Sequence, residues 1–188
     1  RELLRYTGAD YAIVGEGESA FPALLDTLEN AGDPRGIDGV AVWDECGFTV
    51  ASPSYDYCLD GAVLPDYRGW IDVPRYLERG AAVGIQTKRG CPRHCAYCTY
   101  PAIEGRRYRL ADTEKVAAAI ADFARSGIRD FDFVDSVFNA PPSHALQLCR
   151  AVAELPFDLR LQTSELSPPG LDGELLDVMR DAGFVGIG

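Results

Sequence analysis

The chain has 188 residues, of which 47% are apolar and 25% are charged, and its formal net charge is −11. A protein this acidic is not expected to bind a nucleic-acid backbone as its main partner, because phosphate binding needs a basic surface. No run of 18 uninterrupted apolar residues occurs, so the sequence encodes no membrane span.

The first predicted elements are a short helix, a strand and a second helix. The apolar run "YAIV" at 11–14 predicts the strand, and the turn "GEGES" follows it directly. Apolar residues then recur at helical spacing until Gly32 ends the pattern, and they are Phe21, Leu24, Leu25 and Leu28. Residues 10–31 therefore read as strand, loop and helix.

A hairpin and a linker are expected next. The runs 40–43 and 48–51 flank the turn "DECG" and predict two antiparallel strands. Residues 52–80 contain Pro53, Pro65 and Pro74 with little periodicity, which indicates a linker between a first domain at 1–51 and a second at 81–188. The chain starts without Met and stops within an apolar run, so we expect it to be a fragment of a longer protein.

Residues 81–188 alternate between strand and helix patterns, which predicts an α/β fold with a parallel sheet, the first part of a (β/α) barrel. Asp112 is expected to cap one helix and Gly127 to end it. Parallel sheets place their chemistry at the carboxyl ends of the strands, where the cysteine loop, "VDSVFN" and "TSEL" all fall. Strands are predicted at 81–88, 129–139, 158–166 and 184–188, and helices at 112–127, 142–155 and 171–183.

Six cysteines occur without the spacing of a secreted disulfide scaffold and without a signal peptide, which indicates a reducing, cytoplasmic compartment. Cys46, Cys58 and Cys149 fit plain thiols that pack as small hydrophobic groups. The other three, Cys91, Cys95 and Cys98, form a C-x3-C-x2-C pattern that chance rarely produces in a chain with this many cysteines.

Three thiolates leave several chemistries to weigh. Zinc needs a fourth ligand, and the two histidines, His94 and His144, do not form the second short cluster that zinc knuckles use. A redox pair of Cys95 and Cys98 would leave the third cysteine idle. A [4Fe–4S] cluster fits best, because three thiolates hold three irons and leave the fourth open to a cofactor or substrate.

The stretch "KRGCPRHCAYCTY", placed after the first strand of the βα array, resembles the signature loop of the radical S-adenosylmethionine (SAM) superfamily. This resemblance implies that Cys91, Cys95 and Cys98 ligate the cluster and that its open iron binds the amino and carboxylate groups of SAM. It also implies that the reduced cluster cleaves SAM to a 5′-deoxyadenosyl radical. Tyr97 matches the family's aromatic residue near the adenine.

Further SAM contacts are expected at the ends of later strands. In the family a polar motif after the second strand contacts the SAM amino group, and Asp135 and Ser136 occupy this position. The usual second acid is missing, and turn or cap roles are the alternative. Ser164 and Glu165 could bind the ribose or carboxylate of SAM, or form a cap or salt bridge. No role is assigned to Arg106, Arg107 or Arg109, and His94 is read as a loop-packing residue.

The first 80 residues resemble the subgroup of radical SAM proteins in which a Rossmann-like cobalamin domain precedes the barrel. The turn Gly15–Glu18 carries this resemblance, whereas the Asp-x-His-x-x-Gly loop of many cobalamin proteins does not occur. For the full-length protein, the resemblance implies cobalamin-dependent methyl transfer to an unactivated carbon of a small molecule, with a reductant such as flavodoxin or ferredoxin. The fragment alone is expected to bind cobalamin poorly. A methylthiotransferase or radical cyclase is the alternative enzyme, and an iron–sulfur or zinc structural module the alternative of another class.

Overall fold

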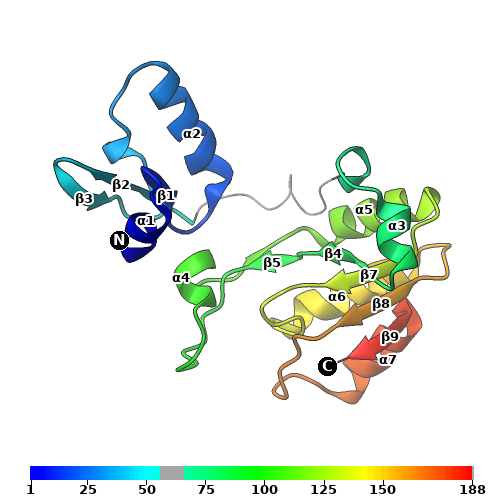
Figure 1. Cartoon of the computed structure of the whole chain (residues 1–188). Coiled ribbons are helices and arrows are strands. Elements are labelled where there is room, and N and C mark those ends of the chain that lie inside the picture. Colours follow the sequence, from blue (N-terminus) through cyan, green and yellow to red (C-terminus); the bar gives the residue numbers. More distant parts are fainter. Residues whose placement is uncertain (56–65, 188) are drawn as a thin grey trace. The chain divides into compact units, whose positions relative to one another are not determined.

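Four parallel strands form the larger sheet of the computed structural model, which describes residues 1–55 and 66–187 (Figure 1). Their order in the sheet is β4-β7-β8-β9, so each new strand is added at the same edge. This confirms the predicted parallel α/β array. The strands are β4 (Val83–Ile85), β7 (Asp130–Phe133), β8 (Arg160–Thr163) and β9 (Phe184–Ile187).

Three helices connect these strands, as the helical periodicity predicted: α5 (Thr113–Arg125), α6 (Pro142–Ala153) and α7 (Gly173–Ala182). Helix α5 begins at the expected cap, because the Asp112 carboxylate accepts hydrogen bonds from the amides of Glu114 and Lys115. The buried face of α5 includes Ile120 and Phe123. Each of the three helices has a buried apolar face of this kind, and packing of that face is the main source of its stability.

The core of this sheet contains an aromatic cluster from three elements. The rings of Phe133 and Phe138 have centroids 5.0 Å apart, and Phe184 lies 5.5 Å and 5.3 Å from them. Aromatic pairs at such distances contribute about 1 kcal/mol beyond the area they bury. The cluster therefore joins the end of β7, the segment that follows it and the start of β9.

The N-terminal part of the chain forms a second, smaller sheet, with the order β1-β2-β3 and antiparallel pairing. The predicted hairpin is confirmed as β2 (Val40–Asp44) and β3 (Gly47–Val50). Residues Ala20, Leu24, Val40 and Val42 form its core. The other elements are α1 (Glu2–Thr7), β1 (Tyr11–Ile13), α2 (Gly17–Glu29) and η1 (Pro34–Gly36).

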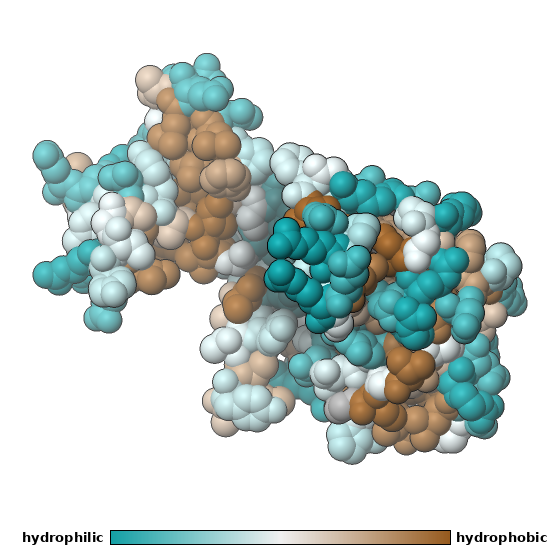
Figure 2. Space-filling model, turned by 45° about the vertical axis from the view of Figure 1, so that its right-hand side comes forward, coloured by the Kyte–Doolittle hydropathy of each residue, from teal (hydrophilic) through white to brown (hydrophobic). Residues whose placement is uncertain are grey.

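Helix α2 has one apolar stripe, and only part of it is buried. Leu24 is buried, whereas Phe21, Leu25 and Leu28 are 52%, 44% and 37% exposed. Figure 2 shows hydrophobic surface gathered on the N-terminal part of the molecule. Only part of the apolar pattern that predicted this helix therefore packs into the small core.

Residues 66–80 lie within the predicted linker and contain two short elements, η3 (Tyr67–Gly69) and α3 (Val73–Glu78). Asp66 and Asp72 cap them with their carboxylates. Arg68 donates a hydrogen bond of 2.7 Å to Asp122 of α5. This part of the segment is thus attached to the larger sheet unit, and the position of the domain boundary stays a prediction. Cys58 and Pro65 lie outside the described residues.

The chain divides into two compact units, each of which contains two separate stretches of the sequence. The first contains Arg1–Tyr57 and Gly90–Arg107, and the second contains Cys58–Arg89 and Tyr108–Gly188. The cysteine loop therefore groups with the N-terminal elements, although it is inserted between strands of the second unit. Within residues 1–55 and 66–187, no helix has the length and apolar character needed to cross a membrane.

Candidate functional site

The cysteine loop is the connection of a small antiparallel ribbon. Strands β5 (Lys88–Arg89) and β6 (Arg109–Leu110) pair with each other, and the chain between them carries the three cysteines and helix α4 (Tyr100–Glu104). The predicted strand 81–88 is therefore split, with β4 in the parallel sheet and Lys88 in the ribbon. The ribbon was not predicted, because two-residue strands leave no periodic pattern.

Hydrogen bonds to the backbone hold both ends of the cysteine loop. The Cys91 amide donates to the Gly105 carbonyl at 3.1 Å, and the Gly90 amide donates to the Glu104 carboxylate at 3.2 Å. Tyr55 donates its hydroxyl to the Ala102 carbonyl of α4 at 2.9 Å. These bonds close the loop on itself and attach it to the chain that follows β3.

Gly90 is required at the start of the loop for two reasons. Its φ is +82°, a conformation that residues with a side chain rarely adopt. A Cβ atom at this position would also lie 2.1 Å from the Arg107 carbonyl oxygen. The glycine that precedes Cys91 thus permits a close backbone contact between the two ends of the loop.

The described cysteines are all free thiols and differ in exposure. Cys91 is buried, Cys98 is half-buried and Cys95 is exposed, and the Cys98 amide donates to the Cys95 carbonyl at 3.2 Å in a tight turn. Three free thiols on one short loop are the donor set that an iron–sulfur cluster needs. Within residues 1–55 and 66–187 no three Cys, His, Asp or Glu side chains are already gathered as a metal site, so the thiols would have to turn toward a cluster.

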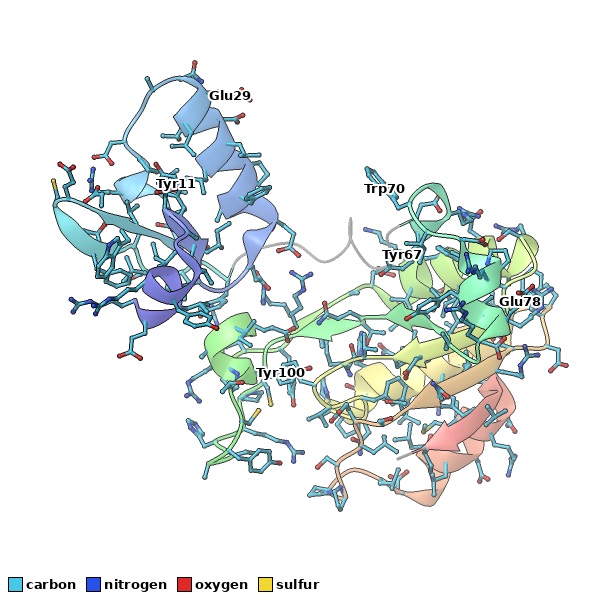
Figure 3. The ribbon with its side chains drawn as sticks, in the orientation of Figure 1. Tyr11, Glu29, Tyr67, Trp70, Glu78 and Tyr100 are labelled. Atoms are coloured by element: carbon cyan, nitrogen blue, oxygen red, sulfur yellow. The ribbon has the colours of Figure 1, made fainter. Side chains whose placement is uncertain are left out.

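Aromatic and basic side chains flank the thiols. The Tyr97 ring is 88% exposed, and Tyr100 begins α4 two residues after Cys98 (Figure 3). His94 lies exposed on the loop, with Nδ1 3.2 Å from the Arg106 guanidinium. The ring of Tyr97 is therefore accessible to a ligand, as the prediction for this position requires.

The predicted polar residues at the sheet end are in very different environments. Ser136 is half-buried, and Ser164 and Glu165 are exposed, all just beyond the carboxyl ends of β7 and β8. Asp135 is fully buried and its oxygens accept hydrogen bonds from Thr87 and Lys88. A contact between Asp135 and SAM stays a prediction, and it would require the buried carboxylate to become accessible.

Lys88 is the polar residue of this region that the sequence did not point to. Its side chain is fully buried, and its ammonium lies 3.6 Å from an oxygen of Asp135. Burial raises the pKa of the Asp135 carboxyl and lowers the pKa of the Lys88 ammonium, and the opposite charge of each partner offsets part of this effect. The one sequence feature that could have drawn attention to Lys88 is its charge at the end of the predicted strand 81–88, in the run "IQTKRG".

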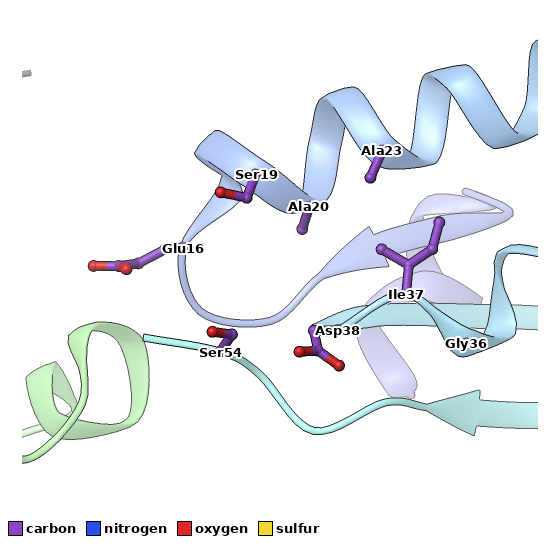
Figure 4. Close-up of a pocket in the computed structure, with 8 residues that line it drawn as sticks. All are labelled: Glu16, Ser19, Ala20, Ala23, Gly36, Ile37, Asp38 and Ser54. Atoms are coloured by element: carbon purple, nitrogen blue, oxygen red, sulfur yellow. The ribbon is translucent and has the colours of Figure 1, made fainter. Parts of the chain in front are cut away.

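The Gly-Glu-Gly-Glu turn borders a pocket in the N-terminal unit (Figure 4). Gly15 has a φ of +88°, and a Cβ there would lie 3.0 Å from Cβ of Pro53. The pocket has a volume of about 450 Å³, with small apolar side chains at the start of α2 and polar groups at its rim. It is lined by Glu16, Ser19, Ala20, Ala23, Gly36, Ile37, Asp38 and Ser54.

The model of the radical SAM superfamily matches residues 85–188, which is more than half of the chain and includes all three loop cysteines. The chain belongs to the radical SAM superfamily. This radical SAM chain is also similar to TsrM, a radical SAM methyltransferase from Kitasatospora setae, with 28% identity and a TM-score of 0.82 over 98% of this chain and 38% of that one. TsrM has also been solved with cobalamin and a [4Fe–4S] cluster bound.

Two curated relatives match at similar identity. An uncharacterized methyltransferase of Pyrococcus horikoshii, PH0819, is 26% identical over 80% of this chain and 33% of its own length. A putative methylthiotransferase of Methanocaldococcus jannaschii, MJ0865, is 29% identical over 68% of this chain and 26% of its own length. The radical SAM chain therefore spans between about a quarter and a third of the length of these curated relatives.

Proposed function

We propose that the protein is a radical SAM enzyme that uses a [4Fe–4S] cluster and cobalamin to transfer a methyl group to an unactivated carbon of a small molecule. The observation that carries this proposal is the set of three free thiols, spaced C-x3-C-x2-C, on the loop between β5 and β6. The family match supports the cluster and SAM. The likeness to TsrM supports cobalamin and methyl transfer.

In this proposal Cys91, Cys95 and Cys98 hold the cluster as thiolates. When bound and reduced, the cluster would supply the electron that cleaves SAM to a 5′-deoxyadenosyl radical, and cobalamin would carry the methyl group. The turn at Gly90 brings the two ends of the loop together, and the three thiols would turn toward the cluster when it binds. Tyr97 offers an exposed ring on which adenine can stack.

Ser136 and Glu165 are proposed as direct polar contacts to SAM, because both lie at the carboxyl ends of neighbouring strands and reach the surface there. Their segments are joined, since the Phe138 amide donates to the Glu165 carbonyl at 2.7 Å. Asp135 is proposed to stabilise the same site indirectly. Its carboxylate accepts hydrogen bonds from the amides of Thr87 and Lys88 and so fixes the backbone there.

Cobalamin would contact the unit that contains the Gly-Glu-Gly-Glu turn. The pocket beside this turn has small apolar and polar side chains that suit part of a large cofactor, and no histidine lines it. The cofactor would therefore take no imidazole ligand from this pocket. Free thiols fit a reducing, cytoplasmic compartment, where a small reductant such as flavodoxin or ferredoxin would supply electrons.

The proposal is tested by SAM cleavage and by cobalamin retention. The protein, reconstituted anaerobically with iron and sulfide and reduced with dithionite, should convert SAM to 5′-deoxyadenosine, and a Cys91/Cys95/Cys98→Ala variant should not. Absence of both SAM binding and cleavage in the wild type would favour a structural iron–sulfur module instead. The full-length protein is then incubated with hydroxocobalamin, and retention of cobalamin through gel filtration supports methyl transfer through cobalamin. Cleavage without retention would favour the methylthiotransferase or cyclase alternative, for which the similarity to MJ0865 speaks.

A further inference from the structure

Lys88 binds the backbone of a segment that is about fifty residues away in the sequence. Its ammonium donates hydrogen bonds to the carbonyls of Phe138 at 2.6 Å, Ala140 at 3.1 Å and Val137 at 3.4 Å. It also lies 5.5 Å from the centre of the Phe138 ring, within the range of a cation–π contact. One buried cation thus gathers three carbonyl groups of the turn after β7.

Asp135, in turn, binds the backbone of the segment that contains Lys88. Its Oδ1 accepts from the Thr87 amide at 2.6 Å and from the Lys88 amide at 3.1 Å, and its Oδ2 accepts from the Thr87 hydroxyl at 2.5 Å. The side chain of each charged residue therefore fixes the backbone of the other segment. Both side chains are fully buried, so solvent screens neither interaction.

Stability alone is a poor explanation for this pair. Removing two charges from water costs several kcal/mol each, and a well-packed apolar pair of similar volume is often as stable. What an apolar pair cannot do is hold three inward-facing carbonyls together. The turn that Lys88 holds begins one residue after Ser136 and carries the Phe138 amide that binds the Glu165 carbonyl.

We propose that Lys88 is a positioning residue for SAM binding, which sets the turn at residues 137–140 and thereby the placement of Ser136 and Glu165. This inference rests on the proposed function, because it assigns both residues to the SAM site. Lys88 itself touches neither the cluster nor SAM in this account. Its reciprocal partner Asp135 sets the backbone of residues 87 and 88, from which the chain continues into the cysteine loop.

The test compares Lys88→Met, of similar length and without charge, with the wild-type protein after anaerobic reconstitution. Lys88→Met should retain the wild-type iron and sulfide content but bind SAM at least about tenfold more weakly, measured by equilibrium dialysis, because bonds to a charged donor are lost. Amide hydrogen exchange in a peptide covering 134–141 should become about tenfold faster. Arg125→Met is the matched control, since the Arg125 side chain is 66% exposed and forms an ion pair with Asp122 at 3.7 Å on the surface of α5.

The double variant Lys88→Met/Asp135→Asn separates positioning from stability, and it keeps the test valid if the single variant does not fold. It removes the uncompensated buried carboxylate, so its thermal stability should exceed that of Lys88→Met, while its SAM affinity should stay low. Wild-type SAM affinity in the double variant, or wild-type exchange at 134–141 in either variant, would overturn the inference. If the wild type bound no SAM, the proposed function would fail, and the exchange at 134–141 would still decide whether Lys88 holds this turn.

Discussion

Asn139 and Ser167 are joined by two hydrogen bonds between one side chain and one backbone: the Ser167 amide donates to Asn139 Oδ1 at 2.9 Å, and Asn139 Nδ2 donates to the Ser167 carbonyl at 2.7 Å. Both residues are buried. The Asn139 side-chain amide thus pairs with the Ser167 backbone as a neighbouring strand would, and it joins the segment after β7 to the segment after β8. The same two segments carry Ser136 and Glu165.

Replacing Asn139 by alanine should destabilise the protein by about 2–4 kcal/mol, because the Ser167 amide and carbonyl would both be left unpaired in the interior. The free energy of unfolding in urea measures this change. Gln162→Ala on the exposed side of β8 is the control, since its bond to Asp132 lies at the surface, and it should change the same quantity by less than about 0.5 kcal/mol. Equal effects of the two variants would contradict the role assigned to Asn139.

Gly90→Ala should prevent the cysteine loop from closing, because the new Cβ would meet the Arg107 carbonyl oxygen at 2.1 Å. We expect the variant to take up less than about half of the wild-type iron on reconstitution, since a misplacement of about 1 Å is enough to spoil a preorganised site. Gly127→Ala is the matched control: its φ is +95°, but nothing lies within 4 Å of its added Cβ. That variant should lose only about 1 kcal/mol of stability and keep its iron. Normal iron uptake by Gly90→Ala would show that the close contact is not needed.

The cysteines should react with iodoacetamide in an order set by their surroundings. Cys149 is buried, and burial raises the pKa of its thiol to about 12, so the reactive thiolate is rare there. Cys46 and Cys95 are exposed and should be alkylated first in the apoprotein, as mass spectrometry of peptides can follow. After reconstitution Cys91, Cys95 and Cys98 should all be protected, while Cys46 stays reactive. Continued labelling of Cys95 in the reconstituted protein would argue against its role as a ligand.

The buried His144 should make the fold sensitive to mild acid. Burial lowers the pKa of its imidazole, and Nε2 donates to the Ala111 carbonyl at 2.9 Å while Nδ1 has no partner among the described residues. Below pH of about 6.5 the unfolded chain binds a proton here that the folded chain does not, so stability falls as the pH falls toward the lowered pKa. His144→Gln, which keeps a donor for Ala111, should show a smaller loss of unfolding free energy between pH 7 and pH 5. An unchanged pH dependence in His144→Gln would assign that dependence to other groups.

The elements that the sequence predicted well are those with long, regular patterns. Helix α5 has a capping aspartate and a periodic buried face, and the alternation of Phe131 and Phe133 with polar neighbours marks β7. Helices α3 and α4 and the β5–β6 ribbon were missed because each is too short to repeat a pattern. Their positions depend on capping and on backbone contacts such as that between Gly90 and Arg107, which only a structure reveals.

The candidate site, like the fold, was predicted only in part from the sequence. The spacing of the three cysteines is local information, so it could be read directly from the sequence. The burial of Lys88 against Asp135 depends on two segments that meet only in the folded sheet, and a lysine after a strand normally signals an exposed position. The pairing of Asn139 with Ser167 was missed for the same reason, since the two residues belong to segments that meet only in the folded sheet.

The central claim is that the three loop thiols hold a [4Fe–4S] cluster with one iron open to SAM. The most direct measurement is anaerobic reconstitution with iron and sulfide, followed by electron paramagnetic resonance of the reduced protein with and without SAM. We expect about four irons per chain and a spectrum that changes when SAM is added. A wild-type protein that took up no more iron than the Cys91/Cys95/Cys98→Ala variant, and that carried zinc through purification instead, would contradict the claim.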